Sequence, residues 1–304
     1  KNQYASMGYR DANITWDTVV EQRDHKVNIY LKVDEGKKYY FRNISWVGNT
    51  KYPDTMLSQI LDIRKGDVFN QKKLDERLQQ NPSGGDVSSL YMDDGYLFFR
   101  IDPQEVAIVG DSVDILMRMY EGNQSTINRI NISGNQKTNE KVIRRELKLK
   151  PGDKFDRSKL IRTQRELAAM GYFNPEATQI IPKPNEDGTV DIDLVVEEKP
   201  NDQLSLSLGY ANVFYGQVGL NFTNFSLRNL TKFKYWKPLP AGDGQTLSLN
   251  VQSSGSLSQI FNVSFTEPWL GGKKPTSLTL SGTHSRFSSP LSNGTTSLFI
   301  RNNL

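Results

Sequence analysis

The sequence predicts tandem α+β modules, each with the order β-α-α-β-β, followed by antiparallel strands of a transmembrane β-barrel. Three observations lead to this fold class. The first 200 residues contain an internal repeat, the hydrophobic periodicity changes to two after it, and the density of charged residues falls near Pro200. Residues 201–304 carry only 8 of the 38 Lys and Arg residues and 3 of the 34 Asp and Glu residues. Two different architectures are therefore expected on either side of Pro200.

The repeat consists of short motifs that recur at a nearly constant distance. Two of them recur 86 residues later, namely Gly48-Asn49 as Gly134-Asn135 and Gly66-Asp67 as Gly152-Asp153. A third, Gly95-Tyr96, recurs as Gly171-Tyr172 after 76 residues, so the earlier copy holds an insertion, which we place at the turn-forming stretch 81–86. Two motifs near the start, Gly8-Tyr9 and Glu35-Gly36, precede Gly95-Tyr96 and Glu121-Gly122 in the same way. They predict the back half of a further copy.

Each module is expected to begin with a strand, a Gly-Asn turn and an amphipathic helix. Gly66 and Gly152 are expected to end that helix, because glycine readily takes the left-handed C′ conformation. Asn70 and Asp156 are expected to cap a second helix. The apolar residues that define these elements are Phe41, Ile44, Trp46, Leu57, Ile60, Leu61, Leu74 and Leu78 in one copy, and Ile127, Ile130, Ile132, Val142, Ile143, Leu147, Leu160, Ile161 and Leu167 in the next.

Gly95 or Gly171 is expected to end the second helix, and a strand led by tyrosine and a hairpin then close the module. In the last copy, residues 185–188 form the hairpin turn, and apolar residues from Val190 to Val196 alternate with polar ones. Two helices can cover one face of each sheet, so every module has a small core of its own. The predicted organisation is the C-terminal half of a module at 1–38, complete modules at 39–122 and 123–200, and the first six or so strands of a barrel at 201–304.

In residues 201–304, apolar side chains alternate with small uncharged polar ones in six segments. Soluble sheets usually place Lys, Glu and Asp on their wet face, so the scarcity of these residues favours a barrel with apolar residues toward lipid and polar residues toward a lumen. A soluble β-sandwich is the alternative. Six strands cannot close a bacterial barrel, which has at least eight. Aromatic residues at the strand ends are expected to lie at the membrane interface: Tyr210, Phe214, Tyr215, Trp236 and Trp269.

Several classes of function are disfavoured by composition and by the lack of motifs. The chain has no cysteine and two histidines, so thiol chemistry is excluded and a histidine-rich metal site is not expected. We find no Walker A loop, nucleophile elbow, zinc-protease motif or dinucleotide fingerprint. Lys and Arg are dispersed among acids, so nucleic acid is not an expected partner. The sequence predicts neither an enzyme nor a bound cofactor or metal.

The chain resembles the BamA family of outer-membrane protein assembly factors. The Gly-Asn turns, the motifs Gly66-Asp67-Val68-Phe69 and Gly152-Asp153-Lys154-Phe155, and Gly171-Tyr172-Phe173 are similar to POTRA domains. Residues 195–200 are similar to the end of the last POTRA, and Phe265–Leu270 to an early barrel strand and turn. The resemblance implies a place in the bacterial outer membrane with the POTRA modules in the periplasm. It implies unfolded β-barrel proteins, accessory assembly lipoproteins and outer-membrane lipid as partners.

The resemblance also implies where clients would bind. In this family the strand after Gly-Tyr is a sheet edge, and an unpaired edge can accept an extended peptide by strand augmentation. The predicted edge residues are Asn13, Ile14, Thr15, Trp16, Leu97, Phe98, Phe99, Glu176, Ala177 and Thr178. Alternatively, these edges only hold neighbouring modules or accessory lipoproteins.

The resemblance also implies that the first barrel strand pairs weakly with the last strand at a seam that can open toward lipid. An opened seam would then pair with a strand of a client protein. The predicted residues of this first strand are Leu204, Ser205, Leu206, Ser207, Leu208, Gly209 and Tyr210. Pairing of this kind needs neither nucleotide nor catalyst. The alternatives to an assembly factor are a TamA-like or two-partner-secretion translocation pore and a periplasmic scaffold that ends in a β-sandwich.

Overall fold

The computed structural model describes most of the chain in two compact units. The described residues are 2–22, 26–81, 84–200, 202–211, 213–236, 239–255, 258–272, 274–290 and 296–303. His25 and the Pro82-Ser83 part of the expected insertion lie outside the described residues. The first unit contains Lys1–Asn128, Pro151–Lys159 and Pro184–Val190, and the second contains Arg129–Lys150, Leu160–Lys183 and Asp191–Leu304.

The first unit begins with a short helix, α1 (Asn2–Ser6), and a two-stranded antiparallel sheet. The strands are β1 (Asn13–Gln22) and β2 (Lys26–Asp34), which pair from Asn13 with Asp34 to Gln22 with Lys26. A helix end and a hairpin are the elements that the repeat predicts for the back half of a module. The apolar side chains of both strands are largely exposed, for example Val19 and Ile29.

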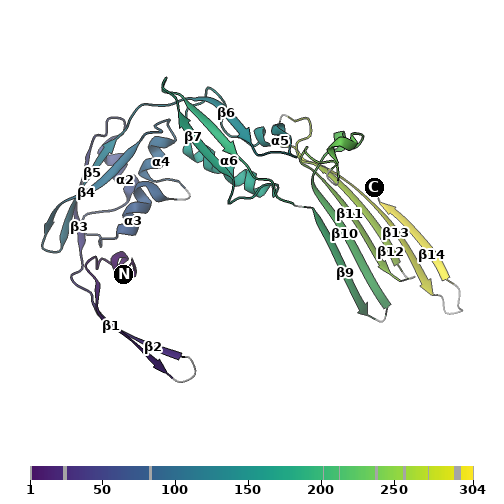
Figure 1. Cartoon of the computed structure of the whole chain (residues 1–304), viewed down its shortest axis with the longest axis horizontal. Coiled ribbons are helices and arrows are strands. Elements are labelled where there is room, and N and C mark those ends of the chain that lie inside the picture. Colours follow the sequence, from purple (N-terminus) through teal and green to yellow (C-terminus); the bar gives the residue numbers. More distant parts are fainter. Residues whose placement is uncertain are drawn as a thin grey trace. The chain divides into compact units, whose positions relative to one another are not determined.

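A complete module follows in the first unit (Figure 1). Its sheet has the order β3-β5-β4, in which β3 (Tyr40–Val47) runs parallel to β5 (Ser112–Tyr120) and β4 (Arg100–Val109) runs antiparallel to it. Helices α2 (Asp54–Leu61), α3 (Gln71–Asp75) and α4 (Val87–Met92) connect β3 to β4. The core joins buried helix residues such as Leu57 and Tyr91 to strand residues such as Phe41 and Met117. The order β-α-α-β-β is the one predicted.

The inserted residues divide the second helix of this module. Asn70 caps α3 as predicted, since its Oδ1 accepts a hydrogen bond from Lys73 N at 3.0 Å. The helix then widens into a π-helical turn, η1 (Glu76–Gln80), and α4 starts anew behind Asp86, whose Oδ1 accepts from Ser89 N at 2.6 Å. The shorter copy keeps one continuous helix, α6 (Arg157–Ala169), behind the predicted cap Asp156.

The first helix ends earlier than predicted. α2 stops at Leu61, and Asp62 takes the left-handed conformation with φ 48° that we expected of Gly66. Gly66 lies further on, with φ 91°, and its N donates to the Phe41 carbonyl at 2.7 Å. Gly152 donates to the Ile127 carbonyl in the same way, at 2.7 Å. These repeated glycines therefore fasten a loop to the opening strand and do not cap a helix.

The repeated Gly-Asn turn has a clear structural cause. Gly48 and Gly134 have φ values of 92° and 91°, and a Cβ at either position would collide with a backbone carbonyl of the closing strand region. The next residue, Asn49 or Asn135, donates from Nδ2 to the carbonyl three residues later at 3.0 Å. Only glycine fits the first position, and the amide closes the turn from the second.

A glutamate at the end of each module holds the backbone after this turn. Glu121 accepts hydrogen bonds from Thr50 N at 2.8 Å and Lys51 N at 2.9 Å, and Tyr91 Oη donates to it at 2.9 Å. Glu198 accepts from Lys137 N at 2.8 Å and from Thr138 N at 2.6 Å. The glutamate therefore ties the last strand of a module to its first turn.

Replacing Glu121 with glutamine is expected to destabilise the module at neutral pH but much less in acid. Burial raises the pKa of Glu121, but the donors from Thr50, Lys51 and Tyr91 outweigh it, so the pKa lies below its ordinary value. The stabilisation is present above the unfolded-state pKa and is lost as pH falls through the folded-state value. We expect Glu121→Gln to lose about 1 kcal/mol at pH 7, the difference between a charge-assisted and a neutral hydrogen bond.

Equilibrium unfolding of both proteins between neutral and acidic pH checks this prediction. The matched control is Glu76→Gln, because Glu76 is an exposed glutamate of the same module, 3.8 Å from Lys72. If the difference in free energy of unfolding between the original protein and Glu121→Gln stayed constant down to acidic pH, the carboxylate charge would have no part in the stabilisation.

The last module has the sheet order β6-β8-β7, with β6 (Ile127–Ser133), β7 (Gln179–Pro184) and β8 (Val190–Val195). In the second unit, α5 (Glu140–Arg144) and α6 pack on this sheet. The buried cluster consists of Val142, Ile143, Leu167, Tyr172, Phe173, Leu194 and Val196. The hairpin turn between β7 and β8 lies at residues 185–189, where the sequence predicts it.

Six antiparallel strands follow in one sheet, each beside its neighbour in sequence (Figure 1). They are β9 (Gln203–Ala211), β10 (Val213–Phe225), β11 (Gln245–Ser254), β12 (Ser258–Glu267), β13 (Leu278–Pro290) and β14 (Thr296–Asn303). A β-sandwich would need two facing sheets, so this arrangement contradicts the sandwich alternative, and the predicted fold class is confirmed. No helix in the described part of the chain is long and apolar enough to cross a membrane.

Candidate functional site

β9 forms one edge of the six-stranded sheet and pairs with β10. In this register Leu204 lies opposite Leu220 and Leu206 lies opposite Val218. Leu204, Leu206 and Leu208 are 71%, 66% and 79% exposed. Across the described residues, no strand pairs with the other side of β9. Within the described residues, this strand of nine residues is therefore an edge of the sheet beside an apolar surface.

The sheet has one apolar and one polar face. One cross-strand row contains the apolar residues Leu206, Val218, Val251 and Phe261 and continues to His284 in β13. The adjacent polar row contains Ser205, Gly219, Asn250, Asn262 and Thr283. On the polar face, Asn262 Nδ2 donates to Thr283 Oγ1 at 2.8 Å, and Ser248 Oγ donates to Asn221 Oδ1 at 2.7 Å. The polar side chains therefore satisfy one another, and the apolar side chains of the other face have no comparable layer over them.

Three of the predicted interface aromatics lie at the β9–β10 hairpin. The rings of Tyr210 and Phe214 are 4.9 Å apart, and both side chains are exposed. Tyr215 lies opposite Gly209, in line with Ser207 and Ser205 on the polar face, so it does not share the apolar face of Tyr210 and Phe214 as predicted. Its ring occupies the space that a Cβ at position 209 would need. A glycine at position 209 therefore lets the tyrosine ring cover the edge strand.

The two predicted tryptophans lie at the opposite end of the strands, near the last module. Trp236 donates from Nε1 to the Asn229 carbonyl at 3.3 Å, within the long connection between β10 and β11. Trp269 donates from Nε1 to Glu146 Oε1 at 2.9 Å, and the Arg145 guanidinium lies 5.5 Å from its ring centre. Trp269 thus contacts the module directly, a role that the sequence did not suggest.

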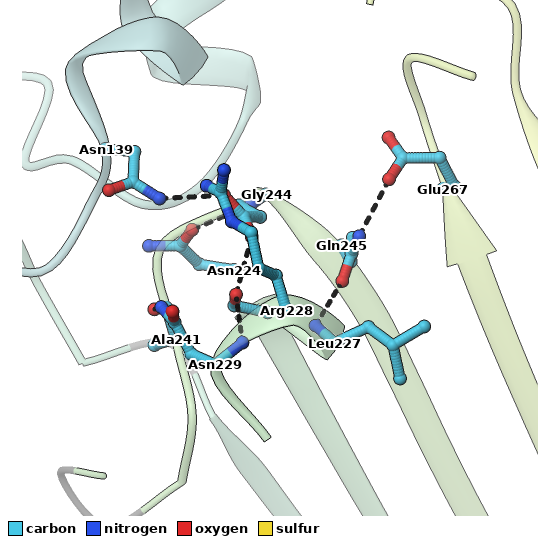
Figure 2. Close-up of polar contacts among 11 residues, drawn as sticks. Asn139, Asn224, Leu227, Arg228, Asn229, Ala241, Gly244, Gln245 and Glu267 are labelled. Carbon is cyan, nitrogen blue, oxygen red and sulfur yellow. Dashed lines mark hydrogen bonds and ion pairs between the residues drawn. The ribbon is translucent and has the colours of Figure 1, made fainter. Parts of the chain in front are cut away.

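The last module and the β10–β11 connection meet in a hydrogen-bonded junction (Figure 2). Asp243 is its central acceptor. Ser226 Oγ donates to it at 2.5 Å, Asn139 Nδ2 at 2.7 Å and Arg228 Nη2 at 2.8 Å. Ser226 is fully buried. One carboxylate therefore joins the module to both ends of the connection.

Asn224 fixes the same connection from the strand side. It takes the left-handed conformation with φ 59° at the bulge between Phe222 and Phe225. Its Oδ1 accepts from Gly244 N at 3.0 Å (Figure 2), and its Nδ2 donates to Thr138 Oγ1 at 2.8 Å. Asparagine is one of the few residues that tolerates this backbone conformation. It also supplies both the donor and the acceptor needed here.

Tyr172 completes the junction from the module. Its hydroxyl donates to the Gly244 carbonyl at 2.9 Å, and burial raises the pKa of Tyr172. These junction residues were not predicted from the sequence. The sequence did contain an indication of them, since Asp243 and Glu267 are two of only three acidic residues in residues 201–304. An isolated acidic residue in such a segment is expected to have a specific partner.

Replacing Asp243 with alanine is expected to loosen the junction. The change leaves the buried Ser226 hydroxyl and the Asn139 amide without their acceptor, at a cost of about 1–3 kcal/mol. Spin labels at Ala169→Cys and Gln252→Cys, one on the module and one on the sheet, report the change as a broader distance distribution. Asp193→Ala, which removes a half-buried acceptor of Lys183 and Asn131 inside the module, away from the junction, is the matched control. An unchanged distribution would mean that the carboxylate does not hold the junction.

The predicted edge residues of the modules do not all lie in strands. The edge strand β4 begins only at Arg100, so Leu97 and Phe98 lie in a turn and Phe99 is buried in the core. β7 likewise begins at Gln179, after Glu176, Ala177 and Thr178. The strands start late because the chain after each Gly-Tyr first makes a turn, which is closed by Phe99 N to the Tyr96 carbonyl at 3.1 Å in one module and by Thr178 N to the Asn174 carbonyl at 3.0 Å in the other. In the partial module, Asn13, Ile14, Thr15 and Trp16 do lie in β1.

Prolines interrupt two of these edge strands. β4 contains Pro103, and β7 contains Pro182 and Pro184. Proline lacks an N–H and is tolerated at an edge only where its nitrogen faces away from the neighbouring strand. Each proline therefore removes a donor that an added strand would use. β1 and β9 contain no proline.

No set of three His, Cys, Asp or Glu side chains in the described residues is placed to hold a metal ion. The site consists of strand edges, an apolar sheet face and a hydrogen-bonded junction. Its chemistry is that of backbone pairing and burial of apolar surface.

Repeated small α+β modules joined to barrel-type strands define the class of this protein. The chain belongs to the POTRA family, whose model, described as surface antigen variable number repeat, matches residues 39–122 and 125–199. The resemblance to BamA predicted from the motifs is confirmed by curated relatives and by the fold, as follows.

Several curated relatives carry the name outer membrane protein assembly factor BamA. The protein of Nitratidesulfovibrio vulgaris is 30% identical over 268 residues, which cover 86% of this chain and 31% of that protein. The protein of Neisseria meningitidis serogroup B is 28% identical over 211 residues, which cover 68% of this chain and 26% of that protein. The chain spans 26% to 33% of the length of the first curated relatives that it matches.

Two solved structures share the fold. BamA from Haemophilus ducreyi lacking POTRA domains 1-3 matches with a TM-score of 0.67 and 21% identity, over 82% of this chain and 43% of that one. Haemophilus influenzae BamA POTRA3-5 matches with a TM-score of 0.53 and 20% identity, over 65% of this chain and 76% of that one. The first match extends beyond the modules into the strands, in agreement with the predicted fold class.

Proposed function

We propose that this chain is the membrane-proximal part of an outer-membrane protein assembly factor. Its POTRA modules lie in the periplasm and receive unfolded β-barrel proteins, and its six-stranded sheet belongs to a barrel in the outer membrane. Insertion of a client depends on backbone pairing with β9. The names of the curated relatives support the general function. The mechanism is supported by the place of β9, a strand without proline that follows directly on the last module and borders the described sheet.

Physical chemistry favours β9 as the strand that templates a client. An unpaired backbone group in hydrocarbon costs several kcal/mol, so a β9 edge that is exposed when a barrel seam opens strongly favours any strand that pairs with it. The apolar side chains of β9 suit a lipid environment, and Ser205 and Ser207 keep the other face small and polar. Such pairing reads the main chain, so it accommodates clients of many sequences.

The edge strands of the modules differ in how long a segment of added strand they can pair with. In β4 and β7 the prolines limit how far an added strand can pair, so these edges hold short segments at most. β1 has ten residues without proline, which favours it for augmentation by a client. Accessory lipoproteins are the other proposed partners of the module edges.

Site-specific crosslinking during assembly tests the proposal. A photoreactive residue at Leu206 in β9 is expected to capture client strands in the full-length protein. The matched control is Val263 in β12, which lies on the same apolar face at 48% exposure but has neighbouring strands on both sides. Equal capture at both positions, or none at Leu206 while assembly proceeds, would refute templating by β9.

A further inference from the structure

The connection between β10 and β11 carries an exposed apolar and basic surface. This surface, which we call the basic turn, comprises Leu227–Trp236 and includes the short 3-10 helices η2 (Leu227–Asn229) and η3 (Phe233–Tyr235). Leu227, Leu230 and Phe233 are 54%, 44% and 76% exposed. The sequence has no acid between Phe225 and Asp243.

Ser226 and Asn229 make their hydrogen bonds inside the connection, whereas Leu227, Leu230 and Phe233 of the basic turn are exposed. Ser226 Oγ caps η2 by accepting from Asn229 N at 3.2 Å, and Asn229 Nδ2 donates to the Ala241 carbonyl at 3.1 Å. Figure 2 shows the Leu227 side chain pointing away from the labelled polar residues. The hydrogen bonds inside the connection therefore fix a backbone conformation in which Leu227, Leu230 and Phe233 are exposed.

The basic turn begins on the apolar face of the sheet. Leu227 N donates to Gln245 Oε1 at 2.7 Å (Figure 2), and Gln245 lies two residues before Leu247 on the same face of β11. Leu247 pairs with Phe222 and Phe265 in one apolar row. The exposed side chains of the turn thus continue the surface that, under the proposed function, contacts lipid.

The charges of the sheet region are concentrated at this end of the strands. Six of its eight basic residues lie in the two connections on this side, at Arg228, Lys232, Lys234, Lys237, Lys273 and Lys274. The connections at the opposite end, residues 212, 255–257 and 291–295, contain no charged residue in the sequence. Arg228 pairs with Asp243, but Lys232 and Lys234 are exposed and have no carboxylate partner among the residues that the structure describes.

We propose that the basic turn, with Leu270 and Lys274 of the next connection, binds the anionic phospholipid headgroups of the leaflet on the module side. Leu227, Leu230 and Phe233 enter the boundary between headgroups and acyl chains, and the lysines contact phosphate groups, as amphipathic interfacial segments do. The inference rests on the membrane-spanning role of the sheet in the proposed function. It adds a lipid preference and an anchor next to β10, the neighbour of β9.

A single fluorescent label tests the proposal in the full-length protein. Thr231 is exposed in the middle of the basic turn, and this chain contains no cysteine, so Thr231→Cys provides a defined site. The protein is placed in nanodiscs of phosphatidylcholine mixed with phosphatidylglycerol, with bromine on the chains of one lipid or the other. We expect stronger quenching by brominated phosphatidylglycerol than by brominated phosphatidylcholine. Lys232→Ser with Lys234→Ser should lower this preference by about fivefold for each lysine removed.

The controls separate failure of this inference from failure of the proposed function. Lys65→Ser with Lys72→Ser changes two exposed lysines of a module and should leave the preference unchanged. A second label at Leu249→Cys, on the apolar face, should be quenched by either brominated lipid. Quenching at Leu249 without headgroup preference at Thr231 would overturn the inference and leave the proposed function standing. Absence of quenching at Leu249 would overturn both.

Discussion

Replacing Leu249 with arginine is expected to lower the free energy of unfolding of the membrane-inserted sheet by about 2–4 kcal/mol, the cost of a cation on the lipid side of a barrel near the bilayer midplane. Leu249 lies near the middle of β11, in a cross-strand row with Leu220 and Val263 on the apolar face. An arginine there must either lose its hydration or thin the bilayer around it. Urea-driven unfolding of the full-length protein from vesicles measures the effect.

The neighbouring substitution Asn250→Arg is the matched control. Asn250 belongs to the polar face, in a row with Gly219 and Asn262, so its side chain would point into water in a barrel. We expect Asn250→Arg to lower the free energy of unfolding much less than Leu249→Arg, although both introduce an arginine and lie one residue apart. Equal costs at both positions would mean that the two faces of the sheet do not meet different solvents.

Proline substitutions in β9 are expected to separate folding from client insertion. Consecutive residues of a strand direct their N–H groups to opposite sides, so one of Ser205→Pro and Leu206→Pro removes a bond to β10 and the other removes a donor from the open edge. The variant that loses the donor on the side away from β10 should fold and yet insert clients at least about tenfold more slowly. Losing one strand hydrogen bond in hydrocarbon costs several kcal/mol, and about 1.4 kcal/mol corresponds to a factor of ten.

Two measurements on each proline variant decide the outcome. Heat-modifiable migration in gels reports the folded barrel, and assembly of a model barrel protein in vesicles reports insertion. The same pair of substitutions at Leu249 and Asn250 in β11, which has neighbours on both sides, should impair folding at both positions. If Ser205→Pro and Leu206→Pro both retained full insertion activity, templating by β9 would be contradicted.

Much of the fold follows from the sequence because the repeat exposes positions where only one residue type works. Gly48 and Gly134 recur because a Cβ would strike backbone, and Asn70 and Asp156 recur because each caps a helix. The alternation in residues 201–304 predicts the two-faced sheet, because the side-chain period of a strand is two. These are local rules, and a single sequence displays them.

Other features depend on contacts between distant segments and were not predictable in the same way. The junction joins Asn139 to Asp243 and Glu146 to Trp269, and no spacing rule connects those positions. The late start of β4 depends on how Phe99 packs into the core behind the preceding turn. Pro103 and Pro182, in contrast, were visible in the sequence, and their effect on strand edges becomes clear once the sheet order is known.

The central claim is that the apolar face of the β9–β14 sheet touches lipid while the other face meets water. Single labelled cysteines at each position from Thr246 to Val251 in β11, read with a lipid-soluble and a water-soluble quencher, test it most directly. We expect an alternation with a period of two, in which Leu247, Leu249 and Val251 respond to the lipid-soluble quencher and the residues between them to the aqueous one. A uniform response along the strand, or the same alternation with the two quenchers exchanged, would contradict it.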